Sequence, residues 1–453
     1  MQRASCSPLR TFPQRRNNLK QHNSAAYAAE FFNAMENVKN FMLRHGMNAE
    51  RVELEQYTRA FYECMERGLK ESQPNVPMIP TYLRLDGQLP KDRKAAVIDA
   101  GGTNYRTALL SFGDNGCRLE CLERSLMPGA LAPAHWSDFI RHTANSIEPL
   151  LDQTDVIGFC FSYPAEVTPD IDSRVLGLTK QVKLLAAHGR LLGADLNAEL
   201  ERRGLGKRKI VVLNDTPATL LGGAAMLDRE RYGGFIGMVA GTGTNTCCGL
   251  PEHRVAKLGL HGDGKMLINL ESGSFDGFPR GDIDLGMDNA LPDTGYYIAE
   301  KMCSGAYLGE LSRYTLQAAA RVGLFSSAAA ELILRLTKLD TPTADAWAAG
   351  KLPECFGMSD RDSAVYIIHE LFDRAARCMC CNLSAILLLT GEGSGKPVCI
   401  SVDGSLFKKS ALFRPLLEKH MQAYAGAALG RHFEFITSDE TTLLGTAAAA
   451  LLN

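Results

Sequence analysis

The sequence predicts an α/β protein whose two domains flank a cleft. Short apolar runs that end in glycine turns alternate along the chain with longer patterns of helical period, which is typical of α/β architecture. A strand, a glycine turn and a returning strand also occur twice, at Val97–Asn104 and at Val239–Asn245. Two such hairpins, one from each domain, can face one another across a cleft. The length of 453 residues is enough for two or three domains.

The composition is that of a globular protein with a core. Hydrophobic residues make up 45% of the chain and charged residues 22%, which excludes a disordered or fibrous protein. The net charge of −2 gives no reason to expect binding to nucleic acid or to an anionic membrane. No apolar run approaches the roughly 18–20 residues that span a bilayer, so we expect a soluble, cytoplasmic protein without membrane insertion. The thirteen cysteines lack metal-ligand spacing, and we expect reduced thiols.

The N-terminal part is predicted to contain an extension, two helices and a linker. Residues 1–23 are basic and are expected to be disordered, because no acidic residue precedes Glu30. This composition also fits a transit peptide, and the sequence leaves that alternative open. Ordered structure is predicted from about Ser24, with one helix that ends near Gly46 and a second over 54–69. The proline-rich stretch 73–80 is expected to be a linker.

The first block of strands is predicted after this linker. The expected elements are strands at 95–100, 106–112 and 117–123, a helix from Ser137 to Leu151, and strands at 156–161 and 209–213. Thr216 is expected to cap the helix after the last of these strands, with Pro217 at its first position, where a missing N–H costs nothing.

The second half of the chain is predicted to open with another strand block and then to become helical. The expected elements are strands at 234–240 and 244–250, a long buried helix through 368–386, a final strand at 398–402 and an alanine-rich helix at 441–452.

The two glycine turns and one aspartate carry the chemistry. Glycine turns present backbone N–H groups that no side chain covers, which is what phosphate oxygens need. Asp215 follows an apolar strand and precedes a helix, where its carboxylate can accept a proton from a hydroxyl group. The alternative role for Asp215 is to cap the helix, but Thr216 is expected to do that.

With these motifs the sequence resembles the hexokinase family, within the actin-like ATPase superfamily, from about Phe31 to the C-terminus. The segments that carry the resemblance are Met78–Tyr82, Asp99–Arg106, Gly158–Pro164, Leu178–Lys180, Leu213–Thr219, Gly241–Asn245, Asn269–Gly273, Glu300–Gly305 and Ser401–Ser405. They stand in the order that the family has them.

The resemblance implies the fold, the reaction and the residue roles. The fold would be two ribonuclease-H-like domains, a large one at 24–83 and 215–438 and a small one at 84–214 and 439–453. The reaction would transfer the γ-phosphoryl group of ATP to the 6-hydroxyl of glucose or a related hexose, the first step of hexose metabolism. Asp215 would be the general base, and Lys180 would place a positive charge near the transferred group. The hexose-binding residues would be Ser162, Thr179, Lys180, Asn214, Asp215, Asn245, Glu271 and Glu300.

The resemblance also implies a nucleotide site. ATP would be bound by Asp99, Gly101, Gly102, Thr103, Asn104, Arg106, Thr242, Gly243, Gly404 and Ser405. Asp99 would hold Mg²⁺ through water, because this ion keeps several waters and needs only one or two carboxylates beside the nucleotide. The protein is expected to be a monomer or a homodimer.

Several alternatives stay open at the level of sequence. The chain can be a non-catalytic sugar sensor of the same fold, an actin-like ATPase, or a kinase for another polyol or aminosugar. Glu271 can be a surface acid at a strand end, and Glu300 can lie beside Lys301 on a solvated helix face. The chain departs from the family around the sugar segment and at Ser438–Thr442, where the family is rich in glycine and serine.

Overall fold

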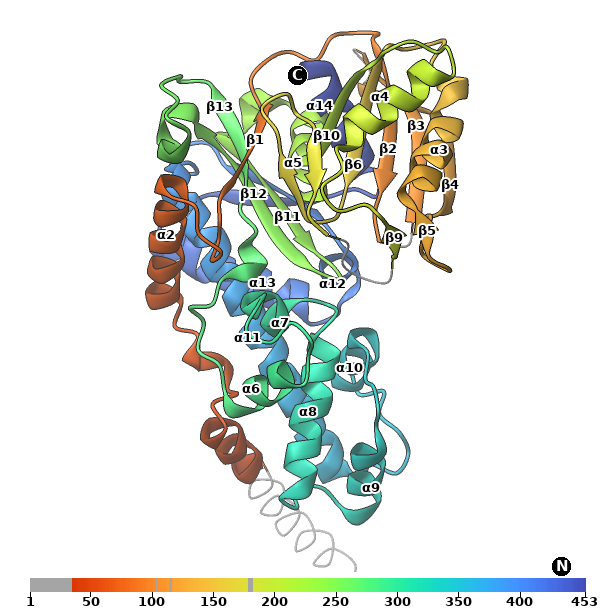
Figure 1. Cartoon of the computed structure of the whole chain (residues 1–453). Coiled ribbons are helices and arrows are strands. Elements are labelled where there is room, and N and C mark those ends of the chain that lie inside the picture. Colours follow the sequence, from red (N-terminus) through yellow and green to blue (C-terminus); the bar gives the residue numbers. More distant parts are fainter. Residues whose placement is uncertain (1–34, 103, 114–115, 178–181) are drawn as a thin grey trace, which may run out of the picture.

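The computed structural model describes residues 35–453 except 103, 114–115 and 178–181 (Figure 1). The predicted N-terminal extension at 1–23 and the candidate residues Thr103, Thr179 and Lys180 lie outside the described residues. Within the described part of the chain, no helix is both long and apolar enough to cross a membrane.

Two mixed sheets form the upper part of the molecule in Figure 1. Over the described residues, the first has the order β10-β6-β2-β3-β4 and the second the order β15-β14-β11-β12-β13-β1. The strands of the first sheet are Lys94–Ala100 (β2), Asn104–Gly113 (β3), Gly116–Leu126 (β4), Val156–Phe161 (β6) and Lys209–Leu213 (β10). Those of the second are Ile79–Arg84 (β1), Gly234–Ala240 (β11), Thr244–Pro251 (β12), Lys265–Asn269 (β13), Val398–Asp403 (β14) and Phe433–Thr437 (β15).

The two sheets share one topology. In the first, β2 pairs antiparallel with β3 and parallel with β6, while β3 is antiparallel to β4 and β6 is parallel to β10. In the second, β11 has the same relation to β12 and β14, which pair with β13 and β15 in the same senses. The repeat that the glycine turns indicated therefore extends over five strands of each sheet. The predicted α/β class with two actin-like domains is confirmed.

Two helices each follow a strand of one sheet but pack on the other sheet. Asp215–Met226 (α5) follows β10 of the first sheet but packs on β11 and β14 of the second. Thr441–Leu452 (α14) follows β15 of the second sheet but packs on β2 and β6 of the first. The helices also pack on each other, so closely that a Cβ atom at Gly445 would lie 1.7 Å from the backbone oxygen of Ala218. The predicted domain boundaries fall just before these helices and remain a proposal.

Helices fill the rest of the molecule. Besides a helix described over 35–44, they are Leu54–Lys70 (α2), Trp136–Ile147 (α3), Leu192–Arg202 (α4), Asp282–Asn289 (α6), Ile298–Cys303 (α7), Leu308–Arg321 (α8), Ser327–Arg335 (α9), Thr341–Ala348 (α10), Met358–Thr390 (α11), Ser405–Lys409 (α12) and Phe413–Met421 (α13). The long helix α11 is mostly buried, as predicted, and lies at the centre of the larger hydrophobic core. Short strands at Ala134–His135 (β5), Ala165–Val167 (β7), Ser173–Val175 (β8) and Leu184–Leu185 (β9) complete the first half.

Two local predictions were wrong and a third held only in part. The proline-rich stretch 73–80, read as a linker, is irregular over 73–78 as predicted, but its last two residues belong to β1, which tolerates Pro80 because it is an edge strand. The strand at 398–402 is not the last, because β15 follows it with a half-buried pattern that gives a weak signal. The helix α3 begins at Trp136 and has no side-chain cap, so Ser137 does not cap it.

Candidate active site

The first glycine turn joins β2 to β3 and has a buried ion pair at its base. Asp99 lies opposite Arg106 in the hairpin. The Nε and Nη2 atoms of Arg106 donate to Oδ2 of Asp99 at 2.8 and 2.5 Å. Burial raises the pKa of Asp99 above its ordinary value, the Arg106 charge opposes this, and the charge of Asp215 adds to it. Asp99 and Asp215 are therefore close enough to interact, although they come from different strands.

Two residues that follow β6 donate hydrogen bonds to the backbone of this turn. The hydroxyl of Tyr163 donates to the backbone oxygen of Gly102 at 2.8 Å, and the backbone N–H of Ser162 donates to that of Ala100. Gly101 and Gly102 are partly exposed, and Asn104 is exposed at the start of β3. These positions leave backbone N–H groups of the turn available to phosphate oxygens.

The second glycine turn joins β11 to β12 and packs against two further segments. The N–H groups of Gly305 and Ala306, which follow α7, donate to the backbone oxygens of Gly241 and Thr242 at 2.8 and 3.0 Å. On the other side, Gly404 has a φ of 113°, and a Cβ atom there would lie 2.3 Å from the backbone of Ala240. Only glycine fits this contact. Thr242 and Ser405 are exposed and Gly243 is half-buried, so the proposed nucleotide residues of this side lie together.

Asp215 is the first residue of α5. The cap of this helix is Asn214, whose Oδ1 accepts from the Thr216 N–H at 3.2 Å, so the prediction that Thr216 is the cap was wrong. Asn214 has the extended backbone that a cap needs, and Asn is among the best capping residues. Pro217 is consequently the third residue of the helix. The carboxylate of Asp215 does not cap the helix. Among the described residues, it accepts a hydrogen bond only from the hydroxyl of Thr216, at 3.2 Å.

Three side chains at the ends of β12 and β13 form a hydrogen-bonded cluster. Asn245 donates to Asn269 at 2.8 Å and to Glu271 at 3.2 Å, and Asn269 donates to Glu271 at 2.7 Å. The pKa of Glu271 is raised to about 7, mainly by burial. The negative charges of Asp215 and Glu300 contribute to this rise, whereas the hydrogen bonds from Asn269 and Asn245 oppose it. Glu271 is thus a partly buried acid, and the alternative of a free surface acid was wrong.

Glu300 lies on α7 beside this cluster. Its Oε2 accepts from the backbone N–H of Thr244 at 2.9 Å, which ties α7 to the second glycine turn. Its neighbour Lys301 is only 3% exposed, so the alternative of a solvated helix face was also wrong.

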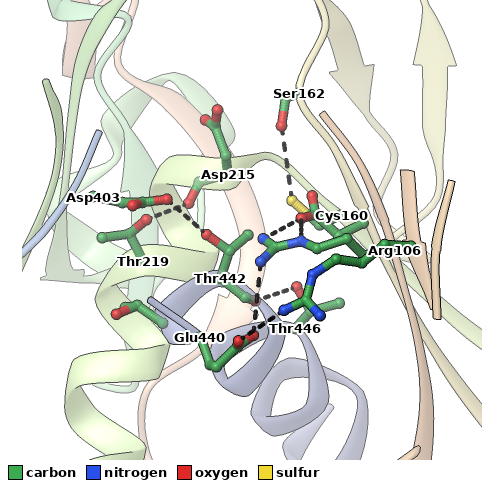
Figure 2. Close-up of polar contacts among 12 residues, drawn as sticks. Arg106, Cys160, Ser162, Asp215, Thr219, Asp403, Glu440, Thr442 and Thr446 are labelled. Carbon is green, nitrogen blue, oxygen red and sulfur yellow. Dashed lines mark hydrogen bonds and ion pairs between the residues drawn. The ribbon is translucent and has the colours of Figure 1, made fainter. Parts of the chain in front are cut away.

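Ser162 follows β6 and is 8% exposed. Its Oγ lies 4.0 Å from the Cys160 sulfur, and the pKa of that thiol is raised by burial and further by the charges of Asp99 and Asp215 (Figure 2). Ser162 therefore borders the space that the two aspartates share. The structure brings together Ser162, Asn214, Asp215, Asn245, Glu271 and Glu300, while Thr179 and Lys180 lie outside the described residues.

Sequence reasoning missed four polar residues near these turns. Asn269 orients Glu271, as described above. Asp403 accepts from Lys408 at 2.7 Å and from Thr442 at 3.1 Å, which joins β14 to α14. Glu440 lies 3.7 Å from Arg106 (Figure 2). It also lies 3.3 Å from Arg124. Asn269 and Asp403 lie inside the segments that carry the family resemblance, and this was the signal that could have identified them. Glu440 and Thr442 lie where the chain departs from the family.

A metal ion at this site would need ligands beyond the described side chains. No cluster of three His, Cys, Asp or Glu side chains in the described residues could hold a metal ion by itself. The carboxylate of Asp99, whose Oδ2 is bonded to Arg106, would suit Mg²⁺ held through water, because this ion takes few protein ligands when phosphates and water supply the others.

Comparisons with known proteins identify the family of the chain. Two models of the family described as hexokinase match residues 39–225 and 235–452. The Hexokinase-like 1 protein of Arabidopsis thaliana is 28% identical over 442 residues, which cover 88% of this chain and 88% of that protein. Human Hexokinase-2 is 27% identical over 395 residues, which cover 80% of this chain but only 42% of that protein, so the chain spans less than half of its length.

The fold is also that of a solved hexokinase. The hexokinase from Schistosoma mansoni complexed with glucose superposes with a TM-score of 0.75 at 21% sequence identity, over 92% of this chain and 99% of that one. Because the family models together match most of the chain and the sheets have the architecture of this structure, the chain belongs to the hexokinase family.

Proposed function

We propose that this protein transfers the γ-phosphoryl group of ATP to the 6-hydroxyl of glucose or a related hexose. The observation that carries the proposal is the position of Asp215. Its carboxylate is left free of helix capping, within electrostatic reach of Asp99 on one side and of Glu271 on the other. This supports a place between the proposed nucleotide residues and the proposed hexose residues, where a base for the attacking hydroxyl is needed.

The hexose would be held mainly by carboxylates and amides. Glu271 and Glu300 accept hydrogen bonds from sugar hydroxyls, and Asn245 offers donor and acceptor atoms beside them. Asn214 and Ser162 border the same space, and Thr179 and Lys180 are proposed to complete it. Because the sugar hydroxyls would meet complementary hydrogen-bond donors and acceptors, the 6-hydroxyl would be brought to Asp215 in a fixed orientation.

The nucleotide would be held between the two glycine turns. Backbone N–H groups at Gly101, Gly102, Thr242 and Gly243 and the Arg106 guanidinium face the phosphates, and Gly404 and Ser405 face the adenosine. When bound, Mg²⁺ supplies charge neutralisation of the phosphate oxygens, and Asp99 is proposed to hold it through water. Asp215 then takes the proton of the 6-hydroxyl as that oxygen attacks, and Lys180 offsets the charge of the transferred group.

The proposal is tested by a panel of sugars. ADP release is measured with purified protein, ATP and Mg²⁺, and with glucose, mannose, fructose, N-acetylglucosamine or no sugar, and the product is identified by phosphorus NMR. We expect ADP release only with a hexose, and a 6-phosphate ester as product. A protein that binds glucose in calorimetry but releases no ADP with any sugar would be the non-catalytic sensor. ATP hydrolysis that ignores every sugar would indicate an ATPase of the same fold.

A further inference from the structure

A buried ion pair joins α6 to α7, next to the proposed hexose ligand Glu300. Asp288 is 4% exposed and Lys301 is 3% exposed. The ammonium of Lys301 donates to Oδ1 of Asp288 at 2.7 Å and to the backbone oxygen of Asp293 at 2.7 Å, and it lies 3.1 Å from Oδ1 of Asp293. A lysine has three N–H donors, so these three acceptors satisfy it completely.

Asp288 is fixed from its other side as well. Its Oδ2 accepts from Arg280 at 2.9 Å, and the backbone N–H of Gly295 donates to both carboxylate oxygens. Burial alone would raise the pKa of Asp288, but the hydrogen bonds from Lys301 and Gly295 and the charges of Lys301 and Arg280 outweigh it and lower the pKa. The pair therefore stays charged and its geometry is determined by many contacts.

The helix that carries Glu300 depends on such contacts for its position. It has only six residues, Ile298–Cys303, too few for a helix to be stable without tertiary contacts. The segment directly after it is held through the backbone, by Gly305 and Ala306 on the second glycine turn. Its start follows Tyr297, which has a left-handed backbone, and the N–H of Ala299 donates to the backbone oxygen of Phe275 at 3.0 Å. The side chain of Lys301, the fourth residue of α7, joins the helix to α6 and to the loop between them, beside the contact of the Gly295 N–H with Asp288.

We propose that Lys301 and Asp288 are positioning residues that hold the start of α7 and thereby set the place of the Glu300 carboxylate in the hexose site. The inference rests on the proposed hexose kinase function. Neither residue contacts the sugar in this scheme. Their loss lets the start of α7 shift, while the backbone hydrogen bonds after α7 keep the second glycine turn in place. Hexose binding is consequently expected to suffer much more than ATP binding.

The same helix offers a matched control. Asp284 lies one turn before Asp288 on α6 and forms a second buried ion pair, with Arg374 of α11, at 2.7 and 2.8 Å. Asp284 is 4% exposed and Arg374 is fully buried, so the two pairs are alike in burial and charge. The Asp284 pair joins α6 to α11 and not to α7. Breaking it lowers stability without releasing Glu300.

The experiment compares the variants Asp288→Asn, Lys301→Met and Asp284→Asn. The glucose dissociation constant is measured by titration calorimetry, the apparent ATP constant by ADP release, and the melting temperature on the same samples. We expect Asp288→Asn and Lys301→Met to raise the glucose constant at least about tenfold, the size of a weakened charged hydrogen bond. The apparent constant for ATP should change by no more than about twofold, because distant sites without shared contacts behave independently. Lys301→Arg, which keeps the charge, should bind glucose better than Lys301→Met.

The control variant decides between positioning and general loosening. Asp284→Asn should lower the melting temperature by a similar amount and leave the glucose constant unchanged. If Asp284→Asn weakens glucose binding as much as Asp288→Asn, or if Asp288→Asn binds glucose like the wild type, the inference is overturned. If a single variant does not fold, the double variant Asp288→Leu/Lys301→Met removes both buried charges of the pair together and is expected to show the same loss of glucose affinity. A wild-type protein that phosphorylates no hexose would instead defeat the proposed function.

Discussion

The amide of Asn269 donates to Oε1 of Glu271 at 2.7 Å, although the two residues are only two positions apart and Glu271 has a left-handed backbone with φ of 55°. The strand β13 ends at Asn269, and the left-handed turn brings the Glu271 carboxylate back over it. Asn245 donates to the same oxygen at 3.2 Å. Two amides thus stabilise the charged form of Glu271, while burial and the charges of Asp215 and Glu300 favour its neutral form and raise its pKa to about 7.

Hexose affinity is therefore expected to depend on pH through Glu271. Only the carboxylate form accepts hydrogen bonds from sugar hydroxyls at both oxygens, so affinity should rise as the pH increases through about 7, the pKa of Glu271. Titration calorimetry with glucose from about pH 5.5 to about pH 8.5 checks this. In Glu271→Gln the pH dependence should disappear and the affinity should fall by about ten- to hundredfold. A wild-type pH profile that Glu271→Gln retains would assign it to another group.

The same pKa predicts an opposite effect on the stability of the free protein. A carboxyl group whose pKa is raised by folding stabilises the folded state most at a pH below its ordinary value of 4.5, and this contribution is lost as the pH rises through about 7. The melting temperature of the sugar-free wild type should therefore fall, relative to that of Glu271→Gln, between about pH 5 and about pH 8. Parallel curves for the two proteins would contradict a raised pKa at this site.

Asp215→Asn is expected to remove the base and keep the binding site. The helix α5 retains its cap at Asn214, so the backbone should not move. Loss of a general base typically lowers turnover by about 10²–10⁴. Turnover and glucose affinity are measured on the same sample, with Asp228→Asn, which removes a capping acid at a short helix outside the site, as the control. Turnover of Asp215→Asn within a few-fold of the wild type would reject Asp215 as the base.

The fold was predictable from the sequence where the periodicity is strong. The helix α14 was predicted at 441–452 and the strand at 156–161 with the bounds that the structure has, because a continuous apolar pattern marks each of them. The strands β1 and β15 were not recognised as such. Pro80 gives β1 the composition of a linker, and β15 has no fully buried residue, so neither has a pattern that singles it out.

The candidate site was predictable only through motifs. Asp215 and the glycine turns could be proposed from residue types alone, whereas Glu271 and Glu300 read as ordinary surface acids until the resemblance was used. The capping of α5 shows why: Asn214 and Thr216 both suit a cap, and the backbone conformation that decides between them cannot be read from the sequence. The contact of Glu440 with Arg106 joins residues 334 positions apart, which no local pattern contains.

Arg106→Met is expected to weaken ATP binding. The side chain of Arg106 is 20% exposed and lies between the carboxylates of Asp99 and Glu440, so its loss leaves two acids beside the phosphate turn. The apparent ATP constant should rise by about ten- to hundredfold, the size of a lost charge-assisted hydrogen bond. Arg124→Met is the matched control, because Arg124 also contacts Glu440 but is 62% exposed. An equal rise in both variants would mean that long-range charge, and not a contact of Arg106, determines the ATP constant.

Hexose binding is expected to close the cleft. The proposed hexose ligands come from both sheets: Ser162 follows β6 of the first, whereas Asn245 and Glu271 lie on β12 and after β13 of the second. A sugar that touches both sides favours a closed form by its differential affinity for that form, and only by that amount. Closure would bring the two glycine turns together around the phosphates and exclude water, which competes with the sugar as acceptor. ATP hydrolysis should therefore be slow without sugar.

Xylose and small-angle scattering test closure together. Xylose lacks the carbon that carries the 6-hydroxyl, so it should close the cleft around a water molecule and accelerate ATP hydrolysis. The radius of gyration should be smaller with glucose than without. Glu300→Gln serves as the control, because it weakens the hexose contact on one side of the cleft and should reduce both effects at the same sugar concentration. A radius that glucose leaves unchanged, with a hydrolysis rate indifferent to xylose, would mean that the two sheets bind sugar as one rigid body.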